Sequence, residues 1–227
     1  MSKALFITAT GTDVGKTYVT GLLIKKLREA GLNAGYYKAA LSGAERQADG
    51  TLLPGDAAFV ANTASIPGNP ADFVSYIYEE AVSPHLAALR SGRPVELAKI
   101  KADYATARQS YDYLTVEGSG GIICPIRWDG QKLLLEDIVK ELELAVLVVS
   151  NAALGSINAC VLTTDYLKSK NIPVQGIILN NYDKDDFMQQ DNKKMIEALG
   201  GVPVIATLAA GAVDISLSAT ELATYYR

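Results

Sequence analysis

The segment 4–17 constrains the fold more than any other part of the sequence. It opens with the apolar run Ala-Leu-Phe-Ile-Thr at 4–8, which is typical of a buried strand, and reaches Gly15-Lys16-Thr17 through a short loop. From 17 to 30 apolar side chains recur with helical spacing, and Gly31 is the expected C-terminal cap. A strand, a loop ending in Gly-Lys-Thr and a helix predict a phosphate-binding loop.

The roles of the loop residues follow from this geometry. Backbone N–H groups of Asp13, Val14 and Gly15, with the positive end of the helix, would surround phosphates. Lys16 would reach the terminal phosphates, and the Thr17 hydroxyl would be a magnesium ligand. The strict motif has a further glycine five residues before Gly15. This sequence has Thr10 there and therefore departs from the strict motif at one position. A plain surface turn is the alternative interpretation.

The rest of the chain alternates short apolar runs with longer helical patterns. Strands are predicted at 4–8, 34–38, 113–117, 145–150, 174–180 and 202–206, and helices at 17–30, 96–110, 133–142, 156–170 and 186–199. Continuous apolar strands suit a mainly parallel sheet that is buried on both faces. We therefore predict one three-layer α/β domain over 1–227, of the P-loop NTPase type. The polar stretch 42–71, rich in glycine and proline, is predicted to be a long irregular excursion.

Composition excludes several classes of function. The chain is 49% hydrophobic and 20% charged, with a net charge of −4 and no basic tract, so no nucleic-acid partner is expected. No apolar run approaches the roughly 18 residues that a membrane span needs, and the N-terminus lacks the pattern of a secretory signal, so we expect a cytoplasmic protein. Two cysteines and one histidine leave no thiolate zinc site or disulfide framework, and a catalytic triad would have to use His85.

Polar residues at predicted strand ends are the other candidates. Glu117 ends a strand next to the phosphate loop, where it could hold magnesium, and Lys38 could neutralise a transferring phosphoryl group. Asp56 could be a magnesium ligand or only a helix N-cap. Asn180 and Asn181 could pair with an adenine edge or form an Asx turn. Taken alone, Glu117 and Lys38 would more often be simply solvated, and Asp56 would more often be an N-cap.

Together these motifs resemble the dethiobiotin synthetases over almost the whole chain. Residues 9–17 are close to the family's Gly-Thr-Asp-Thr-Glu-Val-Gly-Lys-Thr, 37–43 to Tyr-Lys-Pro-x-x-Ser-Gly and 116–121 to Val-Glu-Gly-Ala-Gly-Gly. Residues 82–85 are close to Thr-Ser-Pro-His, and 154–158 to Leu-Gly-x-Ile-Asn. Five strings in the right order and spacing are hard to obtain by chance.

The resemblance implies an ATP-dependent carboxylation of 7,8-diaminopelargonic acid. The substrate takes up CO2, supplied as bicarbonate, to form a carbamate that attacks the γ-phosphate, and the carbamic-phosphoric anhydride then closes to a cyclic urea. By this analogy Lys16 and Lys38 stabilise phosphoryl charge and hold the carbamate, while Thr12 and Ser42 form nearby hydrogen bonds. The substrate's second amine closes the ring, so no protein nucleophile is required.

The resemblance also implies ligand sites and a homodimer. Mg2+ would be organised by Thr17, Asp56 and Glu117. The substrate's distal carboxylate would lie at Gly155, Ser156 and Asn158, contributed by the partner subunit. Further nucleotide contacts are expected from the turn after Glu117 and from two later loops: Gly118, Ser119, Gly120, Asn180, Asn181, Leu208, Ala209 and Ala210.

Five departures from the family pattern and two alternatives remain. One departure is Leu208-Ala209-Ala210, which stands where the family usually has a proline-containing loop against the nucleotide base. Ala9, Gly11 and Asp13 differ in the loop, and Ala39 replaces the proline after Lys38. A related ligase that amidates a large carboxylate is one alternative, although such enzymes usually carry a glutamine-hydrolysing domain. A partitioning-type ATPase switch is the other. Those proteins resemble this fold but carry a signature lysine where this sequence has Gly11, and often a basic tail.

Overall fold

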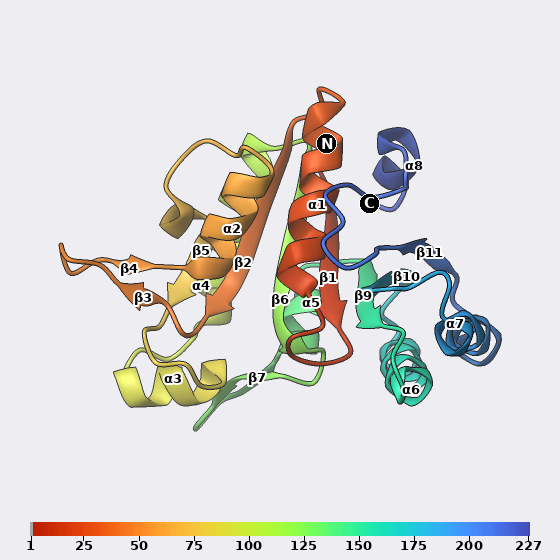
Figure 1. Cartoon of the computed structure of the whole chain (residues 1–227). Coiled ribbons are helices and arrows are strands. Elements are labelled where there is room, and N and C mark those ends of the chain that lie inside the picture. The colour runs from red at the N-terminus through yellow and green to blue at the C-terminus, as the bar shows by residue number, and fades with distance from the viewer. Residues whose placement is uncertain (1) are drawn as a thin grey trace.

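A seven-stranded parallel sheet forms the centre of the computed structural model, which describes residues 2–227 (Figure 1). The strand order is β11-β10-β9-β1-β6-β2-β5, and every neighbouring pair is parallel. The strands are β1 (Lys3–Ala9), β2 (Ala34–Leu41), β5 (Val74–Ile77), β6 (Tyr113–Gly121), β9 (Val146–Asn151), β10 (Val174–Asn180) and β11 (Val204–Thr207). All six predicted strands are therefore confirmed, and β5 is an additional edge strand.

Helices cover both faces of the sheet, because the strands bury side chains on each side. In β1, Phe6 packs into one core while Leu5 and Ile7 pack into the other. One core contains side chains of α1 (Lys16–Glu29), α2 (Gly55–Thr63) and α8 (Ala219–Ala223). The other contains side chains of α3 (Pro84–Ser91), α4 (Leu97–Ser110), α5 (Leu135–Glu141), α6 (Ser156–Ser169) and α7 (Phe187–Gly200). The predicted three-layer α/β fold is confirmed.

The first helix ends as its sequence predicts. Gly31 has a φ of +79°, which glycine adopts without steric cost. The N–H of Leu32 donates to the Leu27 carbonyl at 3.0 Å, and that of Gly31 to the Arg28 carbonyl at 2.9 Å. These two bonds form a Schellman cap, so the chain leaves α1 in a defined direction toward β2.

The stretch 42–71 is more ordered than its composition predicts. It contains the hairpin of β3 (Glu45–Arg46) and β4 (Leu52–Leu53), then α2, and it leads into the 3-10 helix η1 (Pro70–Phe73). The prediction of an irregular excursion is therefore wrong over 55–63, where no proline interrupts the chain and Ala57 and Val60 are fully buried. The helix predicted from 133 begins only at Leu135, because β8 (Lys132–Leu134) pairs with β7 (Pro125–Trp128).

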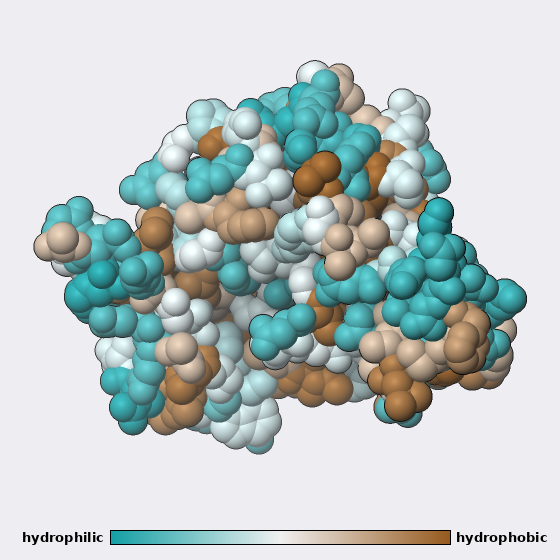
Figure 2. Space-filling view, in the orientation of Figure 1, coloured by the Kyte–Doolittle hydropathy of each residue, from teal (hydrophilic) through white to brown (hydrophobic). Residues whose placement is uncertain are grey.

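The order of the strands places the carboxyl end of β1 at the centre of the molecule. β1 lies between β6 and β9, and α1 crosses from β1 to β2, so the ends of β1, β2 and β6 meet at one edge. In open α/β sheets ligands bind at this edge. Figure 2 shows hydrophilic residues over most of this view, with hydrophobic residues in small separate groups. Within residues 2–227, no helix has the length and apolar character that a bilayer crossing requires.

Candidate active site

The predicted phosphate loop connects β1 to α1 and is held by the two strands beyond it. Gly15 has a φ of +88°, and a Cβ at this position would lie 2.1 Å from Nδ2 of Asn180. That amide donates to the Val14 carbonyl at 3.1 Å. At the start of the loop the Thr10 N–H donates to the Val149 carbonyl at 3.0 Å, and its hydroxyl lies 2.9 Å from that of Ser150. The ends of β9 and β10 thus shape the loop.

The N-terminus of α1 is suited to an anion. No acidic side chain occurs in its first turn, and its N-cap residue, Gly15, has no side chain that could cap the first N–H groups. The first N–H groups of a helix have no partners within the helix and carry part of its positive dipole. A phosphate in the loop would satisfy them.

Glu117 is the centre of the polar network beside this loop. Its Oε1 accepts from the Thr17 hydroxyl at 2.8 Å and from Lys38 Nζ at 2.9 Å, and lies 3.2 Å from Lys16 Nζ. Lys38 also donates to the Asp56 carboxylate. Lys38 is 2% exposed and Glu117 1%, so the charges compensate one another with almost no solvent. Five predicted site residues from β2, α1, α2 and β6 therefore form one network.

The network determines the charge of its members. Burial alone would raise the pKa of Glu117, but the charges and hydrogen bonds of Lys38 and Lys16 outweigh it and lower that pKa to about 2. Burial would lower the pKa of Lys38, but Glu117 and Asp56 raise it above its ordinary value. The pKa of Lys16 is lowered by burial and by the charge of Lys38. Burial and Glu117 raise the pKa of Tyr36 well above its usual value, so its hydroxyl stays protonated.

These residues open into a cleft of about 930 Å3, large enough for a nucleotide and a small substrate. Among the predicted site residues it is lined by Thr12, Asp13, Gly15, Lys16, Thr17, Lys38, Ser42, Asp56, Ser119 and Gly120. Sequence reasoning did not assign site roles to Leu41, Ala81 or Cys124, which also line it. Their apolar or weakly polar side chains offer no signal by themselves.

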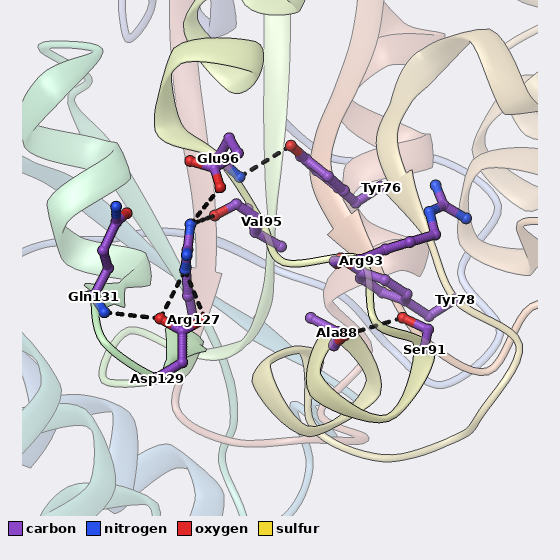
Figure 3. A network of polar contacts seen from close by, with 10 residues as sticks. All are labelled: Tyr76, Tyr78, Ala88, Ser91, Arg93, Val95, Glu96, Arg127, Asp129 and Gln131. Atoms are coloured by element: carbon purple, nitrogen blue, oxygen red, sulfur yellow. Dashed lines mark hydrogen bonds and ion pairs between the residues drawn. The ribbon is translucent and has the colours of Figure 1, made fainter.

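The start of α3 and the turn before β7 form one wall of the cleft. A network of polar contacts that includes β7 lies next to this wall (Figure 3). Arg127 on β7 bonds to the carboxylates of Asp129 and Glu96 and to the Val95 carbonyl, which ties the hairpin to the start of α4. The Glu96 N–H in turn donates to the Tyr76 hydroxyl at 2.9 Å. Three segments that are distant in sequence are thereby fixed around one side of the cleft.

Several predicted nucleotide contacts lie outside the cleft lining. Gly118 is buried, and a Cβ there would lie 2.8 Å from the Phe6 ring, so the structure gives it a packing role. Asn180 lies beneath the loop, and Asn181 is exposed with a φ of +54°. Leu208 is 2% exposed, and its backbone bonds to Leu179 and Tyr182. Ala209 and Ala210 follow as exposed residues of the loop after β11.

The predicted carboxylate site is also separate from the cleft. Gly155, Ser156 and Asn158 begin α6, which follows β9. Ser156 is 3% exposed, and its hydroxyl has no hydrogen-bond partner. Leu154, directly before this helix, is 88% exposed. Within one subunit, the structure does not bring these residues to the phosphate loop.

The donor set beside the loop fits Mg2+. The Thr17 hydroxyl and the carboxylates of Glu117 and Asp56 are hard oxygen ligands, which Mg2+ prefers. Residues 2–227 contain no group of three or more His, Cys, Asp or Glu placed to hold a metal ion.

Comparison with known proteins decides the family. A family profile described as an AAA domain matches residues 3–210. The ATP-dependent dethiobiotin synthetase BioD of Clostridium botulinum (strain Eklund 17B / Type B) is 50% identical over 226 residues, covering 100% of this chain and 99% of that protein. The chain belongs to the dethiobiotin synthetase family. The synthetase of strain Loch Maree / Type A3 is 53% identical over 204 residues, 90% of this chain and 89% of that protein. The family expected from the sequence is confirmed.

Solved structures show how widely the fold of this synthetase family is shared. A ParA family ATPase from Chlorobium tepidum superposes with a TM-score of 0.56 at 15% identity, over 92% of this chain and 84% of that one. A chain of the MinC:MinD cell division protein complex of Aquifex aeolicus gives a TM-score of 0.58 at 15% identity, over 92% of this chain and 81% of that one. These likenesses concern the fold alone.

Proposed function

We propose that the chain carboxylates 7,8-diaminopelargonic acid with CO2 and closes the product to dethiobiotin, using ATP and releasing ADP and phosphate. The observation that carries the proposal is the pair of lysines at the phosphate loop, of which Lys38 is buried and Lys16 is partly buried. Lys38 from β2 and Lys16 from α1 both contact one oxygen of Glu117, at the wall of a cleft that Ser42 also lines. Membership of the synthetase family supplies the substrate.

The two lysines suit a phosphoryl transfer to a carbamate. One amine of the substrate takes up CO2 to give the carbamate, and a carbamate oxygen attacks the γ-phosphorus while ADP leaves. Negative charge then increases on the transferring oxygens. Lys16 and Lys38 would stabilise it electrostatically from a site with little water, where such contacts are strongest. Thr12 and Ser42, both in the cleft lining, would donate hydrogen bonds to the carbamate.

Ring closure needs no nucleophile from the protein. The second amine attacks the carbonyl carbon of the anhydride, and inorganic phosphate leaves with its bonding electrons. Cys124 lines the cleft, but burial raises the pKa of its thiol to about 11, so it stays protonated at neutral pH. His85 does not line the cleft. Positioning of the two ends of one substrate would be the main contribution of the protein.

Thr17, Asp56 and Glu117 would hold Mg2+ against the phosphates. The ion supplies positive charge that shields the β- and γ-phosphate oxygens. Asp56 has a half-exposed carboxylate and therefore contacts both Lys38 and the open cleft. Because Glu117 is ionised far below neutral pH, it would hold the ion or its water shell as a carboxylate.

A homodimer would complete the substrate site. The start of α6 presents helix N–H groups and the unpartnered Ser156 hydroxyl, which suit a carboxylate, yet it lies apart from the cleft of its own subunit. We therefore infer that Gly155, Ser156 and Asn158 of a second copy bind the distal carboxylate. Exposed apolar side chains near α6 support such a contact, since Leu154 is 88% and Leu162 62% exposed.

Asn180 is the proposed contact for the adenine base. Its Nδ2 is occupied by the Val14 carbonyl, but its buried Oδ1 has no partner and could accept from an exocyclic amine. Asn181 and the loop at Leu208, Ala209 and Ala210 would complete the base site, and the turn at Gly118, Ser119 and Gly120 would lie against the phosphates. ATP is a cytoplasmic metabolite, so the proposal places the enzyme in the cytoplasm.

ADP release by the purified protein, with Mg-ATP and bicarbonate, tests the function. We expect release to depend on 7,8-diaminopelargonic acid and to match dethiobiotin detected by mass. Lys38→Ala should lower the rate of dethiobiotin formation about 100- to 1,000-fold. Lys99→Ala, which removes a half-exposed lysine paired with Asp103, should leave that rate unchanged. ATP binding without dependence on the diamine would contradict the proposal and favour a different ligase or an ATPase switch.

A further inference from the structure

Tyr36 lies under the polar network of the site and is absent from every motif considered above. It is the third residue of β2, 1% exposed, and packs in the core beneath α1. Tyr36 pairs with Thr115 and Lys38 with Glu117 along β2 and β6. Because residues two apart in a strand point to the same side, Tyr36 and Lys38 share a face with Glu117.

The two carboxylate oxygens of Glu117 have different surroundings. Oε1 receives Thr17 and Lys38 and lies near Lys16. Oε2 accepts one hydrogen bond, from the Tyr36 hydroxyl at 3.0 Å, and the Glu117 side chain is 0% exposed. Water therefore has no access with which to replace that donor, and without it Oε2 would be a buried, unpaired charged oxygen.

We propose that Tyr36 is a positioning residue that fixes the orientation of the Glu117 carboxylate toward the metal and phosphate site. By occupying Oε2 it leaves Oε1 as the oxygen directed at Thr17 and the two lysines. Without the hydroxyl, the carboxylate would rotate to share a lysine between its two oxygens. Lys16 or Lys38 would then be drawn from the phosphates, and Oε1 from the metal. This inference rests on the proposed role of Glu117 in holding Mg2+, and it does not depend on which substrate is carboxylated.

Tyr36→Phe removes the hydroxyl and keeps the ring. Tyr226→Phe is a matched control, because Tyr226 is also 1% exposed, lies in the same core and bonds through its hydroxyl to a β6 residue, Thr115, at 2.7 Å. Mutation of a residue that hydrogen-bonds to a metal ligand typically weakens metal binding about 10- to 100-fold. With Mn2+ as the probe and ADP present, we expect Tyr36→Phe to weaken Mn2+ binding about tenfold or more. Tyr226→Phe should stay within about twofold of the unchanged protein.

Mn2+ titration followed by electron paramagnetic resonance measures this directly, and urea unfolding checks that the variants lose similar stability. An unchanged Mn2+ affinity in Tyr36→Phe would overturn the proposal, as would an equal loss in Tyr226→Phe or no Mn2+ binding by the unchanged protein. If Tyr36→Phe does not fold, tyrosine labelled at 13Cζ is used in the unchanged protein. Adding Mg2+ to the ADP complex should change the chemical shift of Tyr36 and not that of Tyr226. An unchanged chemical shift of Tyr36 would refute its role in positioning Glu117. A protein that makes no dethiobiotin but shows these shifts would contradict only the proposed reaction.

Discussion

The acid stability of the protein should depend on Glu117 to a degree that the structure specifies. The pKa of this carboxyl is lowered from 4.5 to about 2, so the folded protein releases its proton more readily than the unfolded chain does. A lowered pKa contributes stability that is fully present above the unfolded value and is lost as the pH falls toward the folded one. Between pH 4.5 and pH 3, a span of 1.5 pH units, the free energy of unfolding should fall by about 2 kcal/mol, at about 1.36 kcal/mol per pH unit.

Glu117→Gln removes this titration. At pH 7 the variant should unfold about 3–5 kcal/mol more easily, because buried Lys38 and Lys16 lose their counter-charge. The difference in free energy of unfolding between the unchanged protein and the variant should then be about 2 kcal/mol smaller at pH 3 than at pH 7. Urea unfolding monitored by circular dichroism at a series of pH values measures this difference. The control is Glu79→Gln, whose exposed carboxylate pairs with Arg46 and should change the pH dependence far less. Parallel curves for the unchanged protein and Glu117→Gln would refute the reasoning.

Three further outcomes follow from the site. Lys38→Ala should lower kcat about 100- to 1,000-fold, because the lysine is proposed to act at the reacting centre. The loop is intact in this variant, so its Kd for Mg-ATP by calorimetry should stay within a few-fold of that of the unchanged protein. Retained turnover would remove Lys38 from the mechanism. Gly15→Ala should weaken ATP binding by calorimetry at least about tenfold, because a Cβ would meet Asn180 at 2.1 Å where φ is +88°, and normal affinity would contradict this account of the loop. Ser156→Asp should raise the KM for 7,8-diaminopelargonic acid through charge repulsion and leave the KM for ATP unchanged; steady-state kinetics with each substrate varied decides this, and a shift in both constants would contradict a separate carboxylate site.

The sheet could be predicted from the sequence because most of its strands are long apolar runs. Residues 146–149 are each 0% exposed, and their side chains alternate between the two cores. A continuous apolar run of this length is what a strand buried on both faces needs. The edge strand β5, Val-Ser-Tyr-Ile, has only one neighbour and two half-buried side chains, so its pattern is too short and mixed to stand out. The helix α2 was missed for a related reason, because it follows a run rich in glycine and proline and is only nine residues long.

The site could be predicted only where a residue type has a strong meaning by itself. Lys16 and Thr17 follow from the loop motif, and Glu117 from its predicted place at a strand end, although β6 continues beyond it to Gly121. Tyr36 could not be found in this way, since a tyrosine in a β-strand is ordinarily a core residue. Its contact with Glu117 depends on how β2 and β6 are aligned, and the apolar pattern of β2 does not specify that alignment.

The alignment of β2 with β6 places the ammonium group of Lys38 beside the carboxylate of Glu117. The ParA family ATPase and the chain of the MinC:MinD complex share the sheet at 15% identity, so the sheet does not choose between a ligase and an ATPase switch. Gly11 leaves the early part of the loop without a cation, and the second positive charge comes instead from Lys38, opposite Glu117 on the adjacent strand. A shift of β2 by one residue would place Tyr37 or Ala39 opposite Glu117 and turn the ammonium group of Lys38 into the other core. Burial of that charge without a partner would be costly, so the ion pair proposed to serve the reaction also favours the register in which it forms.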